Sequence, residues 1–276
     1  MKKVLLAFDG SHFSEGAFSF ARQLHDKKRL LLTGAFLPQI EYSNLWSYSG
    51  GGMSGSVFIP LVEDEDAEEV RKNMERFEAQ CKRFGIEYRV HKNFLDFGIA
   101  ELKKESRFAD LLILGSESFY ADSDAGGANE YLIHALEGVE CPVIVVPEKF
   151  DFPRTNILAY DGSESSVFAI KQFAYLFPEL AGNPTQLVYA KKDGKDHLPD
   201  EIYLGELAAR HFRDMELFKF EGHPRDYFTK DNLESCDALL VCGSFGRKGL
   251  SSLFHKSFVS DILKQHSVPI FIAHHQ

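Results

Sequence analysis

The sequence of 276 residues lacks several features that would fix its class at once. Its 4 cysteines form no C-x-x-C pair, which gives zinc-ribbon and thioredoxin-type chemistry no support. No apolar run approaches the roughly 18 residues that a membrane-spanning helix needs. Positive charge is in deficit, with 31 Lys and Arg against 41 Asp and Glu. Neither a nucleic-acid backbone nor an anionic membrane is therefore the expected partner.

Secretion and catalysis signatures are missing as well. The apolar stretch at residues 4–8 is too short for a secretory leader, so we expect a cytoplasmic protein with reduced thiols. There is no Walker A pattern, no H-E-x-x-H and no G-x-S-x-G. Residues 50–55 match G-x-G-x-x-G, but they lie outside any strand-to-helix context and we interpret them as a loop.

The sequence does contain a tandem repeat. Val-Leu-Leu-Ala-Phe-Asp-Gly-Ser at 4–11 recurs as Asn-Ile-Leu-Ala-Tyr-Asp-Gly-Ser at 156–163. In the same order, two further apolar segments recur: 111–116 at 239–244, and 141–146 at 268–273. The repeat predicts two domains, 1–147 and 153–276, with a polar linker between them. The first copy has about 24 extra residues, which we place in the loop-like segment 38–66.

Strands and helices are expected to alternate in each copy. Apolar residues recur at helical spacing after the first strand, at 17, 20, 21 and 24 and at 170, 173, 174 and 177. Ser14 and Ser165 are the expected N-caps of these helices. Later segments are continuously apolar, which predicts parallel strands covered on both faces. The fold class is α/β, with two tandem doubly wound five-stranded parallel-sheet domains.

Ligands on such sheets bind at the carboxyl ends of the strands. Asp9 and Asp161 each follow the first strand of a copy, where each either accepts a hydrogen bond from a ribose or base, or closes an Asx turn. Three glycines and two basic residues follow the fourth strand of the second copy, at 243–249. Glycines let backbone amides approach phosphate oxygens, although the same segment also suits a glycine-rich turn with a solvated basic pair.

These features resemble the universal stress protein family over nearly the whole chain, about 1–147 and 153–273. The resemblance rests on the Asp-Gly-Ser after the first strand, the Gly-Ser after the fourth, and the Pro-Val-Ile-Val-Val-like last strand. It implies the adenine nucleotide alpha hydrolase-like fold, packed as an intramolecular pseudo-dimer through the last strands. It also implies a regulatory role in the stress response.

The resemblance further implies ATP binding, with Mg, in the second domain only. Nucleotide-binding members carry Gly, two residues, Gly, nine residues, then Gly-Ser or Gly-Thr. In the second copy Gly243 and Gly246 match, while Lys256-Ser257 stands where the final pair is expected. Together with the local charge and with positions where the chain departs from the family, the candidate site residues are Tyr160, Asp161, Ala190, Gly243, Gly246, Arg247, Lys256, Ser257 and Phe258.

The first copy departs from this motif. Ser118 replaces the second glycine, and Ala128-Asn129 replaces the last pair. Acidic residues crowd the segment and would repel a triphosphate: Glu117, Asp122, Asp124 and Glu130. Residues 1–150 carry a formal charge of −7, against −3 for residues 151–276. We therefore predict that the first site is lost.

Lys256 leaves alternatives open. Its side chain either blocks the close approach that glycine allows, or pairs with phosphate as a point charge.

The first hypothesis for the function is a stress-response protein whose second domain binds an adenine nucleotide. The alternative is a scaffold or partner-binding protein of the same fold, with residues 41–58 as the partner surface. An enzyme, at most a slow ATP hydrolase, has no nucleophile, base or metal cluster beyond Asp161 to support it.

Overall fold

The computed structural model describes residues 1–9, 12–37, 64–92, 98–117, 119, 130–191, 198–221, 227–228, 237–243, 262–265 and 267–273. In the first half the elements are β1 (Lys2–Phe8), α1 (Glu15–Lys27), β2 (Leu30–Phe36), α2 (Asp64–Phe84), β3 (Glu87–Lys92), α3 (Gly98–Ser106), β4 (Leu111–Gly115), α4 (Glu130–Gly138) and β5 (Val143–Val146). In the second half they are β6 (Thr155–Tyr160), α5 (Glu164–Leu176), α6 (Pro178–Ala181), β7 (Thr185–Lys191), α7 (Glu201–His211), β8 (Met215–Glu221), β9 (Ala238–Gly243) and β10 (Ile270–Ala273). The predicted loop at 41–58 lies outside the described residues.

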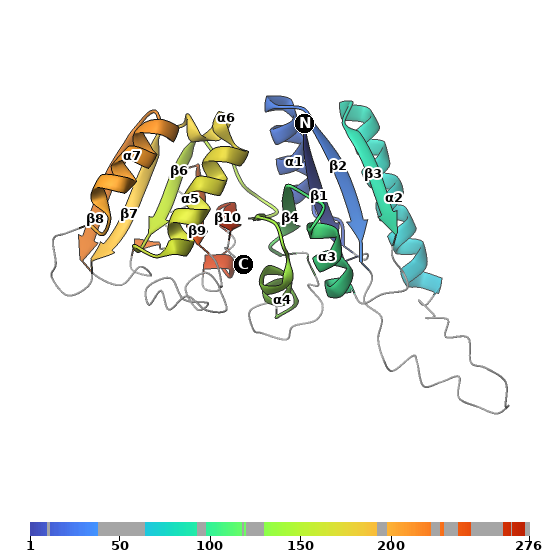
Figure 1. Ribbon diagram of the computed structural model, residues 1–276. Coiled ribbons are helices and arrows are strands. Elements are labelled where there is room, and N and C mark those ends of the chain that lie inside the picture. Colours follow the sequence, from blue (N-terminus) through green and yellow to red (C-terminus); the bar gives the residue numbers. More distant parts are fainter. Residues whose placement is uncertain are drawn as a thin grey trace.

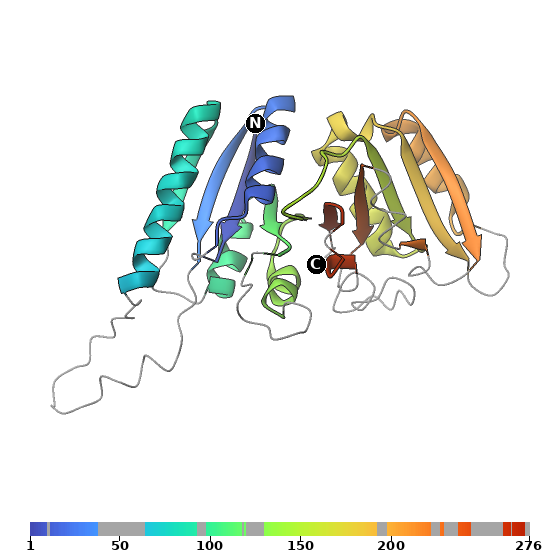
Figure 2. The same ribbon diagram turned by 180° about the vertical axis from the view of Figure 1, so that it is seen from behind.

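All described strands belong to one 10-stranded sheet with the order β3-β2-β1-β4-β5-β10-β9-β6-β7-β8. Neighbouring strands within each half are parallel, as predicted. β5 and β10 are antiparallel, with Phe271 opposite Ile144. The last strands of the two copies thus join the halves, which lie side by side with β10 near the junction (Figures 1 and 2). None of the described helices is long and apolar enough to cross a bilayer.

The first helix of each half begins at a serine cap. The Ser14 hydroxyl accepts a hydrogen bond from the Ala17 N–H at 3.1 Å, as predicted. The prediction of Ser165 was wrong, because α5 begins two residues earlier and its cap is Ser163, which accepts from the Ser166 N–H at 3.2 Å. Asp-Gly-Ser therefore leads directly into the helix in the second half. The predicted apolar faces of both helices are buried.

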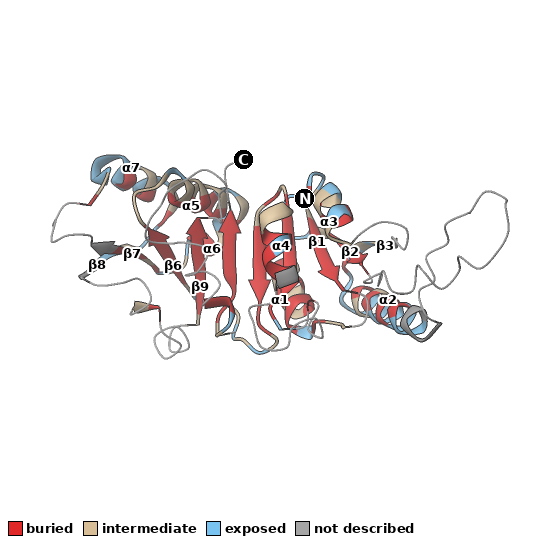
Figure 3. Cartoon of the chain, turned by 90° about the horizontal axis from the view of Figure 1, so that it is seen from below, coloured by how far each residue is buried: buried red, intermediate tan, exposed pale blue. Residues whose placement is uncertain are grey.

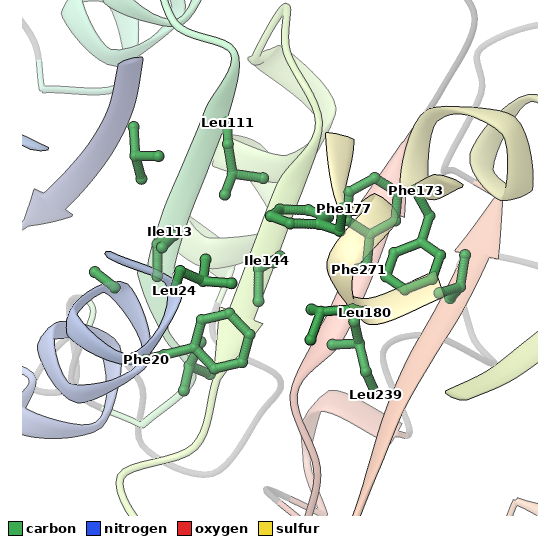
Figure 4. Close-up of a cluster of buried hydrophobic side chains, with 14 of the residues drawn as sticks. Phe20, Leu24, Leu111, Ile113, Ile144, Phe173, Phe177, Leu180, Leu239 and Phe271 are labelled. Atoms are coloured by element: carbon green, nitrogen blue, oxygen red, sulfur yellow. The ribbon is translucent and has the colours of Figure 1, made fainter. Parts of the chain in front are cut away.

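Two apolar clusters cover the two faces of the sheet. On one face a single cluster includes residues of α1, α2, α5 and α6, so it runs across both halves. On the other face the cluster includes residues of α3 and α4. Figure 3 shows buried strands across the middle of the chain and exposed surface on the outer sides of α2 and α7. Close to the junction, Ile144 on β5 lies between Leu24 and Phe271 (Figure 4).

The described cysteines are expected to resist alkylation. Burial raises the pKa of the thiols of Cys81, Cys141 and Cys242 to about 12 in each case. Because the thiolate is the reacting form, the native protein at pH about 8 should leave all three unlabelled by iodoacetamide. Peptide mass spectrometry of the native and the denatured protein checks this, and labelling of any of the three in the native state would contradict it.

Candidate functional site

The carboxyl edge of the second half brings four predicted site residues to one place. Tyr160 pairs with Tyr189 in the β6–β7 register, so Ala190 on β7 stands beside Asp161. On the other side of β6, Leu158 pairs with Val241, two residues before Gly243. Tyr160, Asp161, Ala190 and Gly243 are thus gathered across three adjacent strand ends. The arrowheads of β6, β7 and β8 mark this edge in Figure 1.

Asp161 forms the turn between β6 and α5. Its Oδ1 accepts a hydrogen bond from the Ser163 N–H at 2.9 Å, which is an Asx turn. Gly162 adopts a φ of +81°, a backbone conformation that side-chain-bearing residues rarely adopt. Each residue of Asp-Gly-Ser thus has a structural role: Asp161 closes the turn, Gly162 adopts the positive φ, and Ser163 caps α5. The turn also holds one carboxylate at the strand end, in the place where the resemblance puts a ribose or base contact.

Gly243 allows β9 to end directly against the start of α5. A Cβ atom at this position would lie 2.6 Å from the backbone carbon of Ser165 and 2.7 Å from the Ser166 nitrogen. The glycine is therefore required by close packing of a strand end against a helix N-terminus. Gly243 itself thus lies next to the first turn of α5, where backbone N–H groups favour negative charge.

Tyr160 is fully buried beneath this edge. Its hydroxyl donates a hydrogen bond to the Pro199 carbonyl oxygen at 2.9 Å. Burial, with the carboxylates of Asp200 and Asp161 nearby, raises the pKa of Tyr160 to about 12. The hydroxyl is therefore protonated throughout the ordinary pH range, and it remains a donor. The sequence did not reveal this contact between residues 39 positions apart.

The corresponding aspartate of the first half is engaged within its own loop. Asp9 is 4% exposed. Its Oδ1 accepts from the His12 N–H, and its Oδ2 lies 2.8 Å from His12 Nδ1. Both carboxylate oxygens are thus used by the histidine three residues on. Although the Asp-Gly-Ser sequence is the same, the local structure that follows is different in the two halves.

The difference lies in the length of the connection to the helix. The N-cap follows the aspartate by five residues in the first half and by two in the second. The longer connection contains Phe13, which stacks on Phe8 with the ring centroids 4.8 Å apart. The Phe8 ring also stacks with the ring of Phe36, with the centroids 4.9 Å apart. Apolar rings fill the region below the first-half edge.

Carboxylates supplied by the chain itself occupy the start of α1. The Ser14 hydroxyl donates to Glu148 Oε1 at 2.5 Å, and the Gly16 N–H donates to Glu148 Oε2 at 3.0 Å. Glu117, one of the acidic residues predicted to crowd this segment, accepts a hydrogen bond from the Glu148 N–H. An exogenous anion would have to displace Glu148 from these groups. Sequence reasoning missed Glu148, which lies far from Ser14 along the chain.

Leu37 differs from its second-half counterpart in size. Phe8 pairs with Phe36, so Leu37 stands where Ala190 stands in the second half. The Leu37 side chain is 1% exposed. A larger, buried apolar residue thus occupies the first-half position that corresponds to the predicted site residue Ala190.

Several predicted residues lie outside the described part of the chain. In the second half these are Gly246, Arg247, Lys256, Ser257 and Phe258. In the first half Ser118, Asp122, Asp124, Ala128 and Asn129 do so too. Among the residues that are described, no group of three or more His, Cys, Asp or Glu side chains is arranged to hold a metal ion.

The fold and the strand-end loops define a doubly wound α/β protein with a candidate anion site at the carboxyl edge of one half. No model of a known protein family matches the chain. Universal stress protein Slr1230 of Synechocystis sp. is 26% identical over 294 residues, covering 98% of this chain and 99% of that protein. The chain is therefore similar in sequence to a universal stress protein over nearly its full length.

Two solved structures have the same fold over nearly the full length. A universal stress protein from Archaeoglobus fulgidus gives a TM-score of 0.68 at 15% identity, covering 99% of this chain and 96% of that chain. A functionally unknown protein from Pseudomonas aeruginosa gives a TM-score of 0.57 at 13% identity, with coverages of 99% and 92%. The α/β fold predicted from the sequence is therefore confirmed.

Proposed function

We propose that this chain is a regulatory protein of the stress response whose second half binds ATP or a related adenine nucleotide with Mg. The first half contributes the other part of the sheet and binds no nucleotide. The observation that carries the proposal is the difference between the two carboxyl edges. The second-half edge has a short turn after Asp161 and a small residue at Ala190. In the first half the corresponding edge is lined by His12, Leu37 and Glu148.

The residues at the second-half edge suit an adenosine phosphate. The Asp161 carboxylate can accept hydrogen bonds from ribose hydroxyls, as acidic residues do at the edge of related sheets. Ala190, on the adjacent strand, has a smaller side chain than its first-half counterpart Leu37 and so demands less space beside a planar base. Gly243 lies against the first turn of α5, and Arg247 and Lys256 add positive charge to the sequence that follows it. Each of these groups contributes to a different part of the ligand.

Replacing Asp161 with alanine should weaken nucleotide binding. Loss of a hydrogen bond to a charged group costs about 1.5–3 kcal/mol, so the Kd for MgATP should rise at least about tenfold. Titration calorimetry of the purified full chain measures the effect. The matched control is Asp9→Asn, which should leave the Kd unchanged because Asp9 belongs to the first half. Equal losses in the two variants would contradict the proposed asymmetry.

A second pair of variants tests the glycine motif. Gly246→Ala should weaken nucleotide binding, whereas Ser118→Ala, at the matching position of the first copy, should have no effect on it. If the wild-type chain binds nucleotide and Gly246→Ala leaves the Kd unchanged, the nucleotide binds at another site. If no adenine nucleotide binds at millimolar concentration, Lys256 is an obstruction, and the scaffold alternative replaces the proposed function.

A further inference from the structure

A short segment before α7 lies across the second-half turn. We call this segment, Leu198–Asp200, the strap. The Pro199 carbonyl accepts the Tyr160 hydroxyl hydrogen bond at 2.9 Å. The Pro199 ring also rests against Gly162, where an added Cβ would come within 3.0 Å of Pro199 Cβ and Cγ. The strap is thus in contact with the turn that presents Asp161.

The two ends of the strap, Leu198 and Asp200, are in different environments. Leu198 is 2% exposed and belongs to the apolar cluster that also contains Tyr160. Asp200 has a φ of 52°, in the left-handed region, and its side chain makes no capping bond to α7. A non-glycine residue in this conformation is strained and must be held by its surroundings. The hydrogen bond from Tyr160 is a contact that can hold it.

The first half has no equivalent hydroxyl at this position. Its counterpart of Tyr160 is Phe8, whose ring is stacked with those of Phe13 and Phe36. The tyrosine therefore distinguishes the half in which we propose a nucleotide site. Because burial and two nearby carboxylates raise the pKa of Tyr160 to about 12, the donor is not lost by ionisation near neutral pH.

We propose that the Tyr160 hydroxyl is a latch that holds the strap over the Asp161–Ser163 turn and thereby controls nucleotide access to the second-half site. This inference rests on the proposed function for the identity of the ligand. Tyr160 acts as a positioning residue, since its buried hydroxyl contacts the strap. Release of the latch exposes the turn, so that a nucleotide can associate faster.

The latch is tested by hydrogen exchange of the full chain without nucleotide. Tyr160→Phe should speed exchange of the Leu198, Asp200 and Glu201 amides by about threefold to tenfold, the range given by losing one ordinary hydrogen bond. Gly162→Ala reaches the strap by another route, because its methyl group presses on Pro199, and should act in the same direction. The control is Tyr189→Phe, which removes a hydroxyl from the adjacent strand and should leave the strap amides unchanged.

A second readout is the association rate of MgATP, followed by stopped-flow fluorescence of a labelled ATP analogue. Tyr160→Phe should raise this rate about threefold or more, whereas Tyr189→Phe should not. Unchanged exchange in Tyr160→Phe, or an equal change in Tyr189→Phe, overturns the latch. If Tyr160→Phe speeds exchange of the strap amides but leaves the association rate of MgATP unchanged, the latch does not control nucleotide access. If the wild-type chain binds no nucleotide, the proposed function and the control of access fail, while the exchange data still decide whether the latch exists.

Discussion

Replacing Phe271 with alanine should lower the free energy of unfolding by about 3–5 kcal/mol. Phe271 is fully buried on β10, the strand that joins the two halves through its antiparallel pairing with β5. Its ring packs edge-on against Phe173, with centroids 5.6 Å apart, and against Phe177, at 6.0 Å. Truncation therefore removes apolar contacts and leaves a cavity at the junction (Figure 4).

Urea denaturation followed by circular dichroism measures this loss. The matched control is Phe108→Ala, because Phe108 is 70% exposed and its removal should change stability by no more than about 0.5 kcal/mol. If the two phenylalanine variants lost similar stability, Phe271 would not be a central packing residue. The arrangement of β10 between β5 and β9 would then need revision.

Replacing Gly16 with alanine should cost about 2–3 kcal/mol, since a methyl group must be forced into a closely packed region. A Cβ at this position would lie 2.1 Å from the Pro147 carbonyl oxygen and 2.7 Å from the Glu148 Cα. These are backbone atoms, which cannot rotate away as a flexible side chain would. The substitution would push the segment after β5 away from α1 and disturb the contact of Glu148 with Ser14 and the Gly16 N–H.

Gly205→Ala is the control for this prediction. Gly205 lies within α7, and apart from the helix's own backbone and the two neighbouring residues nothing lies within 4 Å of the position that its Cβ would take. Alanine should therefore stabilise the protein by about 0.5–1 kcal/mol through its higher helix propensity. Thermal denaturation of both variants gives the comparison. A stability gain, or no loss, in Gly16→Ala would show that Pro147 and Glu148 do not approach α1 as described.

Much of the fold could be predicted because it depends on local patterns that the repeat presents twice. The recurring apolar segments at 4–11 and 111–116 overlap strands β1 and β4 in the structure, and the helical face at 17, 20, 21 and 24 is buried. The error at Ser165 has a physical reason. Ser163 and Ser165 are both good capping residues, and the Asx turn of Asp161 decides between them by directing the chain into the helix at once.

The differences between the two site edges were harder to predict from the sequence. Acidic crowding at Glu117 predicted a lost first site, but the residues that line this edge in the structure include His12, Phe13 and Glu148. The pairing of β1 with β4 and of β4 with β5 brings Glu148 near Ser14, so no local pattern marks it. In the same way, Pro199 meets Tyr160 through the packing of the segment before α7. Such contacts depend on tertiary structure, which spacing along the chain does not encode.

The most direct test of the asymmetry between the halves is the stoichiometry of nucleotide binding. The purified chain is first checked for co-purified nucleotide by analysing a denatured extract. It is then titrated with MgATP in a calorimeter. We expect one nucleotide per chain, abolished or weakened by Asp161→Ala and unaffected by Asp9→Asn. Two nucleotides per chain, or binding that survives Asp161→Ala unchanged, would contradict this account, as would the absence of any binding.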